Sequence, residues 1–276
     1  MYKHLLVHVD AGARAAGRVE LAVKLAARFG ARLTALFAQD DGWRPRSGGP
    51  RPSASEDLAA AATVLEEKAD AAGVSHDLWK VPNGELDPGG VAARFCRYAD
   101  LTILGQPDPE EPRVPVDLAS KVLLESGRPV LLLPSGGRVR DVGRRVVVEW
   151  FGSRESARAL GDALPLLRGA ERVHVLDLRA RGGCVADDDE PAREVVRHLA
   201  AHGVAARAEA TYLSVREAKA SGLEVLDVLL NRSADLGADL VVMGARGRHG
   251  VPFPRVARST QRSLDELTAP VLLSHG

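Results

Sequence analysis

The chain has 276 residues, with 37 basic and 37 acidic side chains, so its formal net charge is zero. This balance gives no reason to expect nucleic acid or an acidic membrane surface as a partner. No apolar run approaches the roughly 20 residues of a membrane span. The apolar stretch Met1 to Val9 is too short for a signal peptide. We therefore expect a cytoplasmic protein whose partner is a small molecule or another protein.

Strands and helices alternate along the first half. Leu5 to Val9 has the composition of a strand, and Ala13 to Arg28 carries apolar residues at helical spacing up to Gly30, a helix stop. Ser53 and Glu56 form a capping box at the start of an alanine-rich helix. The other predicted elements are strands at 32–37, 75–81, 101–104 and 130–133 and helices at 53–72, 90–98 and 117–125, with a loop at 42–55.

The second half alternates in the same way. Its predicted strands are 146–148, 173–178, 205–212, 240–243 and 271–273, and its predicted helices are 155–167, 191–202, 224–236 and 259–266. Alternation of this kind requires parallel strands with helices on both faces of a sheet, because a right-handed crossover packs its helix back onto the sheet. The continuous apolar runs at 101–104 and 240–243 agree with strands that are buried on both sides.

The two halves also repeat each other in sequence. The repeated segments are Ala99-Asp-Leu-Thr-Ile-Leu-Gly105 with Ala238-Asp-Leu-Val-Val-Met-Gly244, Pro129-Val-Leu-Leu with Pro270-Val-Leu-Leu, and His4 to Asp10 with Arg145 to Phe151. Because these anchors keep one register, we predict two similar domains, 1–135 and 143–276, joined by a linker at 136–142.

Ligands of such open sheets bind beyond the carboxyl ends of the strands, where the strand order reverses. After the fourth strand of the second half comes Gly244-Ala-Arg-Gly247-Arg-His-Gly250, and Arg258 and Ser259 follow at a predicted helix start. Glycine lets backbone amides approach an anion, and a helix N-terminus favours negative charge. This segment is a candidate phosphate cradle, although it lacks the lysine of a P-loop and the Gly-x-Gly spacing of a dinucleotide site.

Together these motifs resemble a tandem universal stress protein. The resemblance rests on Lys3 to Asp10, Phe151-Gly-Ser-Arg-Glu-Ser156, Gly237 to Gly247 and the two Pro-Val-Leu-Leu endings. It implies two tandem Rossmann-like α/β domains of the adenine nucleotide alpha hydrolase-like type, each a five-stranded parallel sheet between helices. In that family the last strand of each domain pairs domains into a dimer. The two halves could form this pair internally, as a pseudo-dimer, or two chains could form a homodimer.

Nucleotide-binding members of the family carry an acid after strand one, and Gly-x-x-Gly, nine residues and Gly-Ser or Gly-Thr after strand four. The first half keeps the acid as Asp10, which the resemblance assigns to the base or ribose. Its other interpretation is a cap for the following helix. Where the second glycine belongs, the chain has Gly105-Gln-Pro-Asp108. Pro107 removes a donor and Asp108 opposes phosphate charge, so we do not expect a triphosphate there.

The second half keeps the Gly244 to Gly247 spacing but has Phe151 in place of the acid and Ala257-Arg258 as the closing pair. Losing a carboxylate that binds a ribose hydroxyl typically costs about 1 to 3 kcal/mol. Nearby arginines could supply anion contacts in exchange, or the segment is a solvated arginine-rich loop. The candidate cofactor-binding residues of the whole chain are Asp10, Gly244, Arg246, Gly247, Arg258 and Ser259.

We interpret the chain as a non-enzymatic stress-response binding or interaction module with partly degraded nucleotide-binding motifs. The alternative is a regulatory switch that binds ATP or AMP through the Gly244 to Gly247 loop. Hydrolase and metalloprotease motifs are absent from the sequence. The expected partners are an adenine nucleotide and the other half of the chain or a second chain, but neither nucleic acid nor a membrane.

Metal binding has little support in the sequence. Cys96 and Cys184 fall at non-equivalent places in the two halves and have no zinc-site spacing, so free thiols in a reducing compartment are expected. His198 and His202 lie four residues apart on a predicted helix, but no further ligand follows at a recognisable distance. We expect two surface histidines and no metal site.

Overall fold

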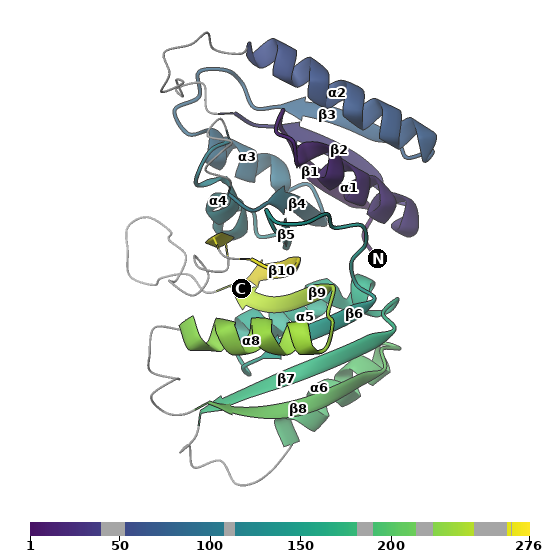
Figure 1. Ribbon diagram of the computed structural model, residues 1–276, viewed down its shortest axis with the longest axis vertical. Coiled ribbons are helices and arrows are strands. Elements are labelled where there is room, and N and C mark those ends of the chain that lie inside the picture. The colour runs from purple at the N-terminus through teal and green to yellow at the C-terminus, as the bar shows by residue number, and fades with distance from the viewer. Residues whose placement is uncertain (40–52, 108–113, 181–189, 214–222, 246–263, 266) are drawn as a thin grey trace. The chain divides into compact units, whose positions relative to one another are not determined.

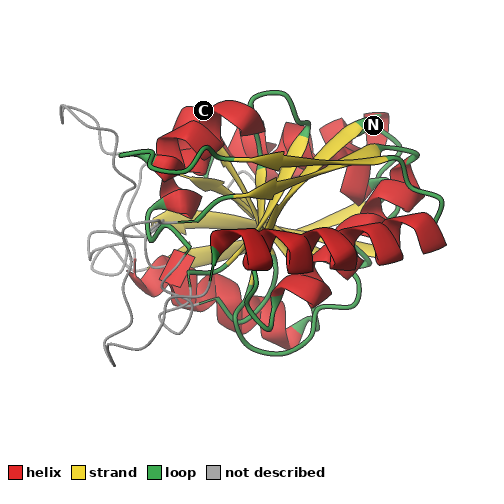
Figure 2. Ribbon diagram, turned by 90° about the horizontal axis from the view of Figure 1, so that it is seen from above, coloured by secondary structure: helices red, strands yellow, loops and turns green. Residues whose placement is uncertain are grey.

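The computed structural model describes residues 1–39, 53–107, 114–180, 190–213, 223–245, 264–265 and 267–276 (Figure 1). The chain divides into two compact units, Met1–Arg140 and Asp141–Gly276. The division falls within the predicted linker at 136–142. Each unit is an α/β domain with helices on both faces of its strands (Figure 2), as the sequence predicts.

Unit 1 contains five parallel strands. Its elements are β1 (His4–Val9), α1 (Ala15–Phe29), β2 (Arg32–Phe37), α2 (Ala54–Ala71), β3 (His76–Lys80), α3 (Pro88–Cys96), β4 (Leu101–Gly105), α4 (Leu118–Glu125) and β5 (Val130–Leu133). The strand order is β3-β2-β1-β4-β5, and each neighbouring pair is parallel. The order reverses between β1 and β4, which locates the expected ligand crevice at the carboxyl ends of these two strands.

Unit 2 has the same architecture. Its described elements are β6 (Arg145–Trp150), α5 (Arg154–Leu167), β7 (Arg172–Ala180), α6 (Glu190–Ala201), β8 (Ala206–Leu213), α8 (Leu223–Asp235), β9 (Leu240–Ala245) and β10 (Val271–His275). The order is β10-β9-β6-β7-β8, again with parallel pairs. The helix predicted at 259–266 lies largely outside the described residues.

Local sequence signals set the helix ends. Ser53 accepts a hydrogen bond from the Glu56 amide, and Glu56 accepts one from the Ser53 amide, which completes the predicted capping box of α2. Helix α1 ends at Gly30, whose φ of 57° lies in the left-handed region that favours glycine.

The repeated aspartate of each Ala-Asp motif has a structural role. Asp100 Oδ2 accepts hydrogen bonds from the amides of Lys3 and His4 at 2.7 and 3.0 Å. Asp239 Oδ1 accepts hydrogen bonds from the amides of Gly143 and Arg144 at 2.8 and 3.0 Å. Each carboxylate therefore fixes the start of the first strand of its unit.

The cores are built from the strands. Leu5, Leu6 and Val7 of β1 and Val147 and Val148 of β6 are fully buried, as expected for central parallel strands covered on both faces. Among the described helices, none combines the length and apolar character needed to cross a membrane.

Candidate functional site

A cavity of about 680 Å³ opens in unit 1 at the carboxyl ends of β1 and β4. Its walls come from the β1–α1 loop and the first turns of α1, from the end of β4, and from the chain after β5. His8, Asp10, Arg18 and Gln106 are among its polar lining residues. Its position at the reversal of strand order and its size are those of a small-molecule site.

Asp10 is held inside this crevice by the protein itself. Its side chain is 7% exposed. Oδ1 accepts a hydrogen bond of 2.7 Å from the Gly12 amide, and Oδ2 pairs with Nη2 of Arg18. Arg18 also donates from Nε to the His8 carbonyl oxygen at 2.7 Å. The N-cap position of α1 is held by Arg14, whose side chain makes no capping hydrogen bond, so the interpretation of Asp10 as the cap of this helix is wrong.

The ionisation states of the crevice follow from burial and from this ion pair. Burial raises the pKa of Asp10. Arg18, His8 and the Gly12 amide together lower it by more than burial raises it, so the pKa of Asp10 lies below its usual value. Burial lowers the pKa of His8 to about 4. His8 is therefore neutral near pH 7 and donates from Nε2 to the Ala38 carbonyl oxygen at 3.1 Å.

Gly105, the strand-four glycine of unit 1, lies directly against Arg18. A Cβ atom at this position would be 2.5 Å from Arg18 Nη1. The next amide, of Gln106, donates to the Leu133 carbonyl oxygen at 2.8 Å. The Gln106 side chain accepts a hydrogen bond of 2.8 Å from the Ser135 amide. The chain after β5 thus binds the polar groups of Gln106, and Arg18 lies against the end of β4.

Charged side chains also meet at the rim of the crevice. Glu20 pairs with Arg138 at 2.7 Å and with Lys68 at 3.6 Å. The hydrogen bond from Arg138 holds the pKa of Glu20 below its usual value. These side chains are partly exposed, and solvent screening makes such pairs weak. They orient the segment after β5 across α1 without adding much stability.

In unit 2 a carboxylate binds the equivalent glycine. Glu149 of β6 is 6% exposed, and its Oε2 accepts a hydrogen bond of 3.0 Å from the Gly244 amide. A Cβ atom on Gly244 would be 2.7 Å from Glu155 C and from Ser156 N. Glycine is therefore required here for contact with the first turn of α5, and its amide is bound to an acid.

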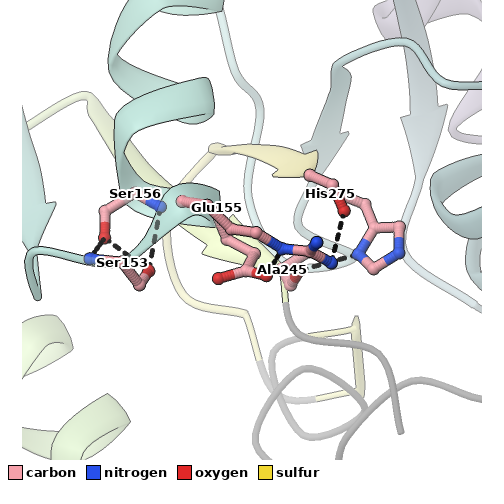
Figure 3. Close-up of polar contacts among 7 residues, drawn as sticks. Ser153, Glu155, Ser156, Ala245 and His275 are labelled. Carbon is pink, nitrogen blue, oxygen red and sulfur yellow. Dashed lines mark hydrogen bonds and ion pairs between the residues drawn. The ribbon is translucent and has the colours of Figure 1, made fainter. Parts of the chain in front are cut away.

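The start of α5 is capped by its own serines (Figure 3). The Ser156 amide donates to Ser153 Oγ at 3.2 Å, and the Ser153 amide donates to Ser156 Oγ at 3.3 Å. Arg154 binds the Glu155 carboxylate at 2.8 Å, and the His275 ring lies 3.0 Å from the Ala245 carbonyl oxygen. The amides of Ser153 and Ser156 at the start of α5 are therefore already bound by side chains of the same helix end.

The predicted site residues separate into two groups. Asp10 and Gly244 are described and belong to different units, whereas Arg246, Gly247, Arg258 and Ser259 lie outside the described residues. Sequence reasoning missed Arg18, which pairs with Asp10, and Glu149, which binds the Gly244 amide. The sequence carried one signal for Arg18, its place among apolar residues at helical spacing, which predicts burial but does not identify Asp10 as its partner.

The other sequence candidates lie away from the crevices. Cys96 is a buried free thiol, and burial raises its pKa to about 12, so it is an unreactive residue. Cys184 falls outside the described residues. The His198 and His202 rings lie 4.7 Å apart. Within the described ranges, no group of three or more metal-ligating side chains occurs.

Comparison with known proteins gives one consistent result. The model of the family described as "Universal stress protein family" matches residues 1–134. A universal stress protein from Archaeoglobus fulgidus DSM 4304 superposes with a TM-score of 0.72 at 16% identity, over 99% of this chain and 98% of that chain. A functionally unknown protein from Pseudomonas aeruginosa PAO1 gives 0.61 at 17% identity, over 99% and 92%. No curated protein matches the chain significantly. At these identities the structural likeness establishes the fold, and it does so for both units.

Proposed function

Since residues 1–134 belong to the universal stress protein family and the whole chain has the fold of a two-domain universal stress protein, we propose that it is a stress-response binding module without catalytic activity. In this proposal the unit 1 crevice is closed to ATP and AMP by the protein's own side chains. The observation that supports it is the buried Asp10–Arg18 ion pair beside Gly105.

The ion pair opposes nucleotide binding through its energetics. A ribose or base that bound Asp10 would compete with Arg18 and the Gly12 amide for the carboxylate, and a ligand that displaced Arg18 would break the buried pair. Leaving one charge of a buried pair without its partner costs about 3 to 5 kcal/mol. Each 1.4 kcal/mol corresponds to about a tenfold change in affinity. A ligand would need strong compensating contacts, and Gln106 and Arg18 are already engaged.

Calorimetric titration of the full chain with ATP and AMP tests the closed crevice. We expect no affinity in the low micromolar range for the parent protein. The Asp10→Asn variant should bind nucleotide more tightly than the parent, because it frees the Arg18 guanidinium for phosphate at almost unchanged shape. If Asp10 is instead a nucleotide ligand, the same substitution weakens binding. Low micromolar affinity in the parent that falls in Asp10→Asn contradicts the proposal.

The alternative is a nucleotide switch in unit 2 that uses the Gly244 to Gly247 loop. The buried Glu149 carboxylate on the Gly244 amide is unfavourable for it, since phosphate would compete with an acid for the same donor. The same titration distinguishes the two functions. Tight nucleotide binding that is unchanged in Asp10→Asn favours the switch.

A further inference from the structure

Unit 1 carries a second hollow, which lies at the edge strand β3 rather than at the carboxyl ends of β1 and β4. This aromatic pocket has a volume of about 620 Å³ and is lined by Arg32, Leu78, Trp79, Lys80, Phe95 and Tyr98. It shares no lining residue with the crevice around Asp10. Its size is sufficient for a small molecule.

Three aromatic rings line the aromatic pocket. The Trp79 ring lies 5.6 Å from that of Phe95, at an angle of 43°, and 6.5 Å from that of Tyr98, at 88°. These rings are not part of a closed core, because Tyr98 is 71% exposed and Trp79 and Phe95 are half-buried. Rings held in place by each other and open to solvent present a preformed surface for a planar ligand.

Two cations line the aromatic pocket, and its lining contains no acid. In the part of the chain that the structure describes, neither Arg32 nor Lys80 forms an ion pair. Arg32 Nη2 lies 3.1 Å from His4 Nδ1. That nitrogen is only 2.7 Å from the Tyr98 carbonyl oxygen, so it carries the imidazole proton and donates to this oxygen. His4 therefore offers Arg32 no acceptor, and the guanidinium keeps its capacity to bind an anion.

The second copy of the domain shows that the fold does not require this cluster. The strand registers place Glu209 of unit 2 at the position of Trp79, and the repeated Ala-Asp motif places Gly237 at the position of Tyr98. Glu209 forms an ion pair of 2.7 Å with Arg232. Unit 2 thus places an ion-paired glutamate where unit 1 has Trp79, and among the described residues of unit 1 the cations beside Trp79 have no ion pair.

We propose that the aromatic pocket binds a planar aromatic anion, with its ring against Trp79 and Tyr98 and its acidic group at Arg32 and Lys80. The rings supply dispersion and stacking contacts, and the cations supply charge-assisted hydrogen bonds. A neutral aromatic molecule loses the second contribution and a small non-aromatic anion loses the first. The site is independent of the crevice and of the function proposed for it.

Naphthoate is a suitable probe, because it joins a planar ring to one carboxylate. We expect saturable binding to the full chain in a calorimetric titration. Naphthyl methanol keeps the ring and lacks the charge. Its affinity should be lower than that of naphthoate by about tenfold or more, as expected for the loss of charge-assisted hydrogen bonds. Acetate, which lacks the ring, should show no saturable binding. Failure of naphthoate to saturate the parent protein overturns the proposal.

Variants locate the binding site. Arg32→Gln and Trp79→Leu should each weaken naphthoate binding about tenfold, and Lys80→Gln should weaken it in the same direction. Arg138→Gln, at the rim of the crevice, is the matched control and should leave the affinity unchanged. Should Trp79→Leu fail to fold, Arg32→Gln and Lys80→Gln still decide. Affinity that survives Arg32→Gln and Lys80→Gln, or falls in Arg138→Gln, places the ligand elsewhere and contradicts the proposal.

Discussion

Arg18 is the residue on which the proposed closure of the unit 1 crevice depends, because it pairs with Asp10 and lies against Gly105. Asp10 was identifiable from the sequence by its place after the first strand. Its partner was not, since the pairing of an arginine on the apolar face of α1 with this carboxylate depends on tertiary packing. The contact between Glu149 and Gly244 was not predictable either, because the two residues are far apart in the sequence. Their neighbouring strands bring Glu149 Oε2 to 3.0 Å from the Gly244 amide nitrogen.

At the residue scale, His8 should make stability depend on pH. Burial lowers its pKa from 6.5 to about 4, so between these values the folded protein binds fewer protons than the unfolded chain. The free energy of unfolding is therefore unaffected by His8 titration above pH 6.5, and it decreases as the pH falls from 6.5 to about 4. The loss should amount to about 3 kcal/mol of unfolding free energy.

Urea unfolding of the parent and of His8→Gln at several pH values measures this contribution. The difference between the two proteins isolates His8, because His4, whose pKa burial also lowers, is present in both. The parent should lose more stability than the variant on acidification through this range. Parallel pH dependences of the two proteins contradict the assignment.

At the scale of elements, the strand-four glycines of the two units make different contacts. A Cβ atom on Gly244 meets the backbone of the first turn of α5 at 2.7 Å, whereas one on Gly105 meets the end of the Arg18 side chain at 2.5 Å. Backbone yields less readily than a side-chain end. Gly244→Ala should therefore cost about 1 to 3 kcal/mol of unfolding free energy, and Gly105→Ala should cost less.

Gly161 provides the matched control for these substitutions. It lies inside α5, and a Cβ atom there has nothing within 4 Å. Gly161→Ala should leave stability unchanged or raise it, since alanine is the better helix former. Denaturant unfolding of the three variants gives the ranking. A cost for Gly105→Ala equal to or above that for Gly244→Ala shows that the α5 contact is not the constraint.

The elements themselves were largely predictable from the sequence. Helix α2 has the Ser53 capping box, and α1 stops at Gly30, because both signals act locally. Strand ends were less predictable. The structure extends β7 to Ala180, where the apolar pattern predicts an end at 178, since pairing with β8 continues beyond the apolar run.

For the whole molecule, the repeat predicted architecture better than function. The repeated Asp100 and Asp239 fix the starts of the first strands, so the most conspicuous shared polar residues have a structural role. The polar and aromatic residues on which the proposals rest differ between the copies: Arg18 and Trp79 belong to unit 1 and Glu149 to unit 2. Such differences identify candidate positions in a sequence, but the contacts that they make require the fold.

In the function that we propose, the protein's own side chains already bind the polar groups that a nucleotide would use in unit 1. The most direct test is to purify the full chain from cells without added nucleotide, denature it, and examine the supernatant chromatographically for adenine nucleotides. We expect no nucleotide at a level comparable to that of the protein. Release of one ATP or AMP per chain would contradict the claim.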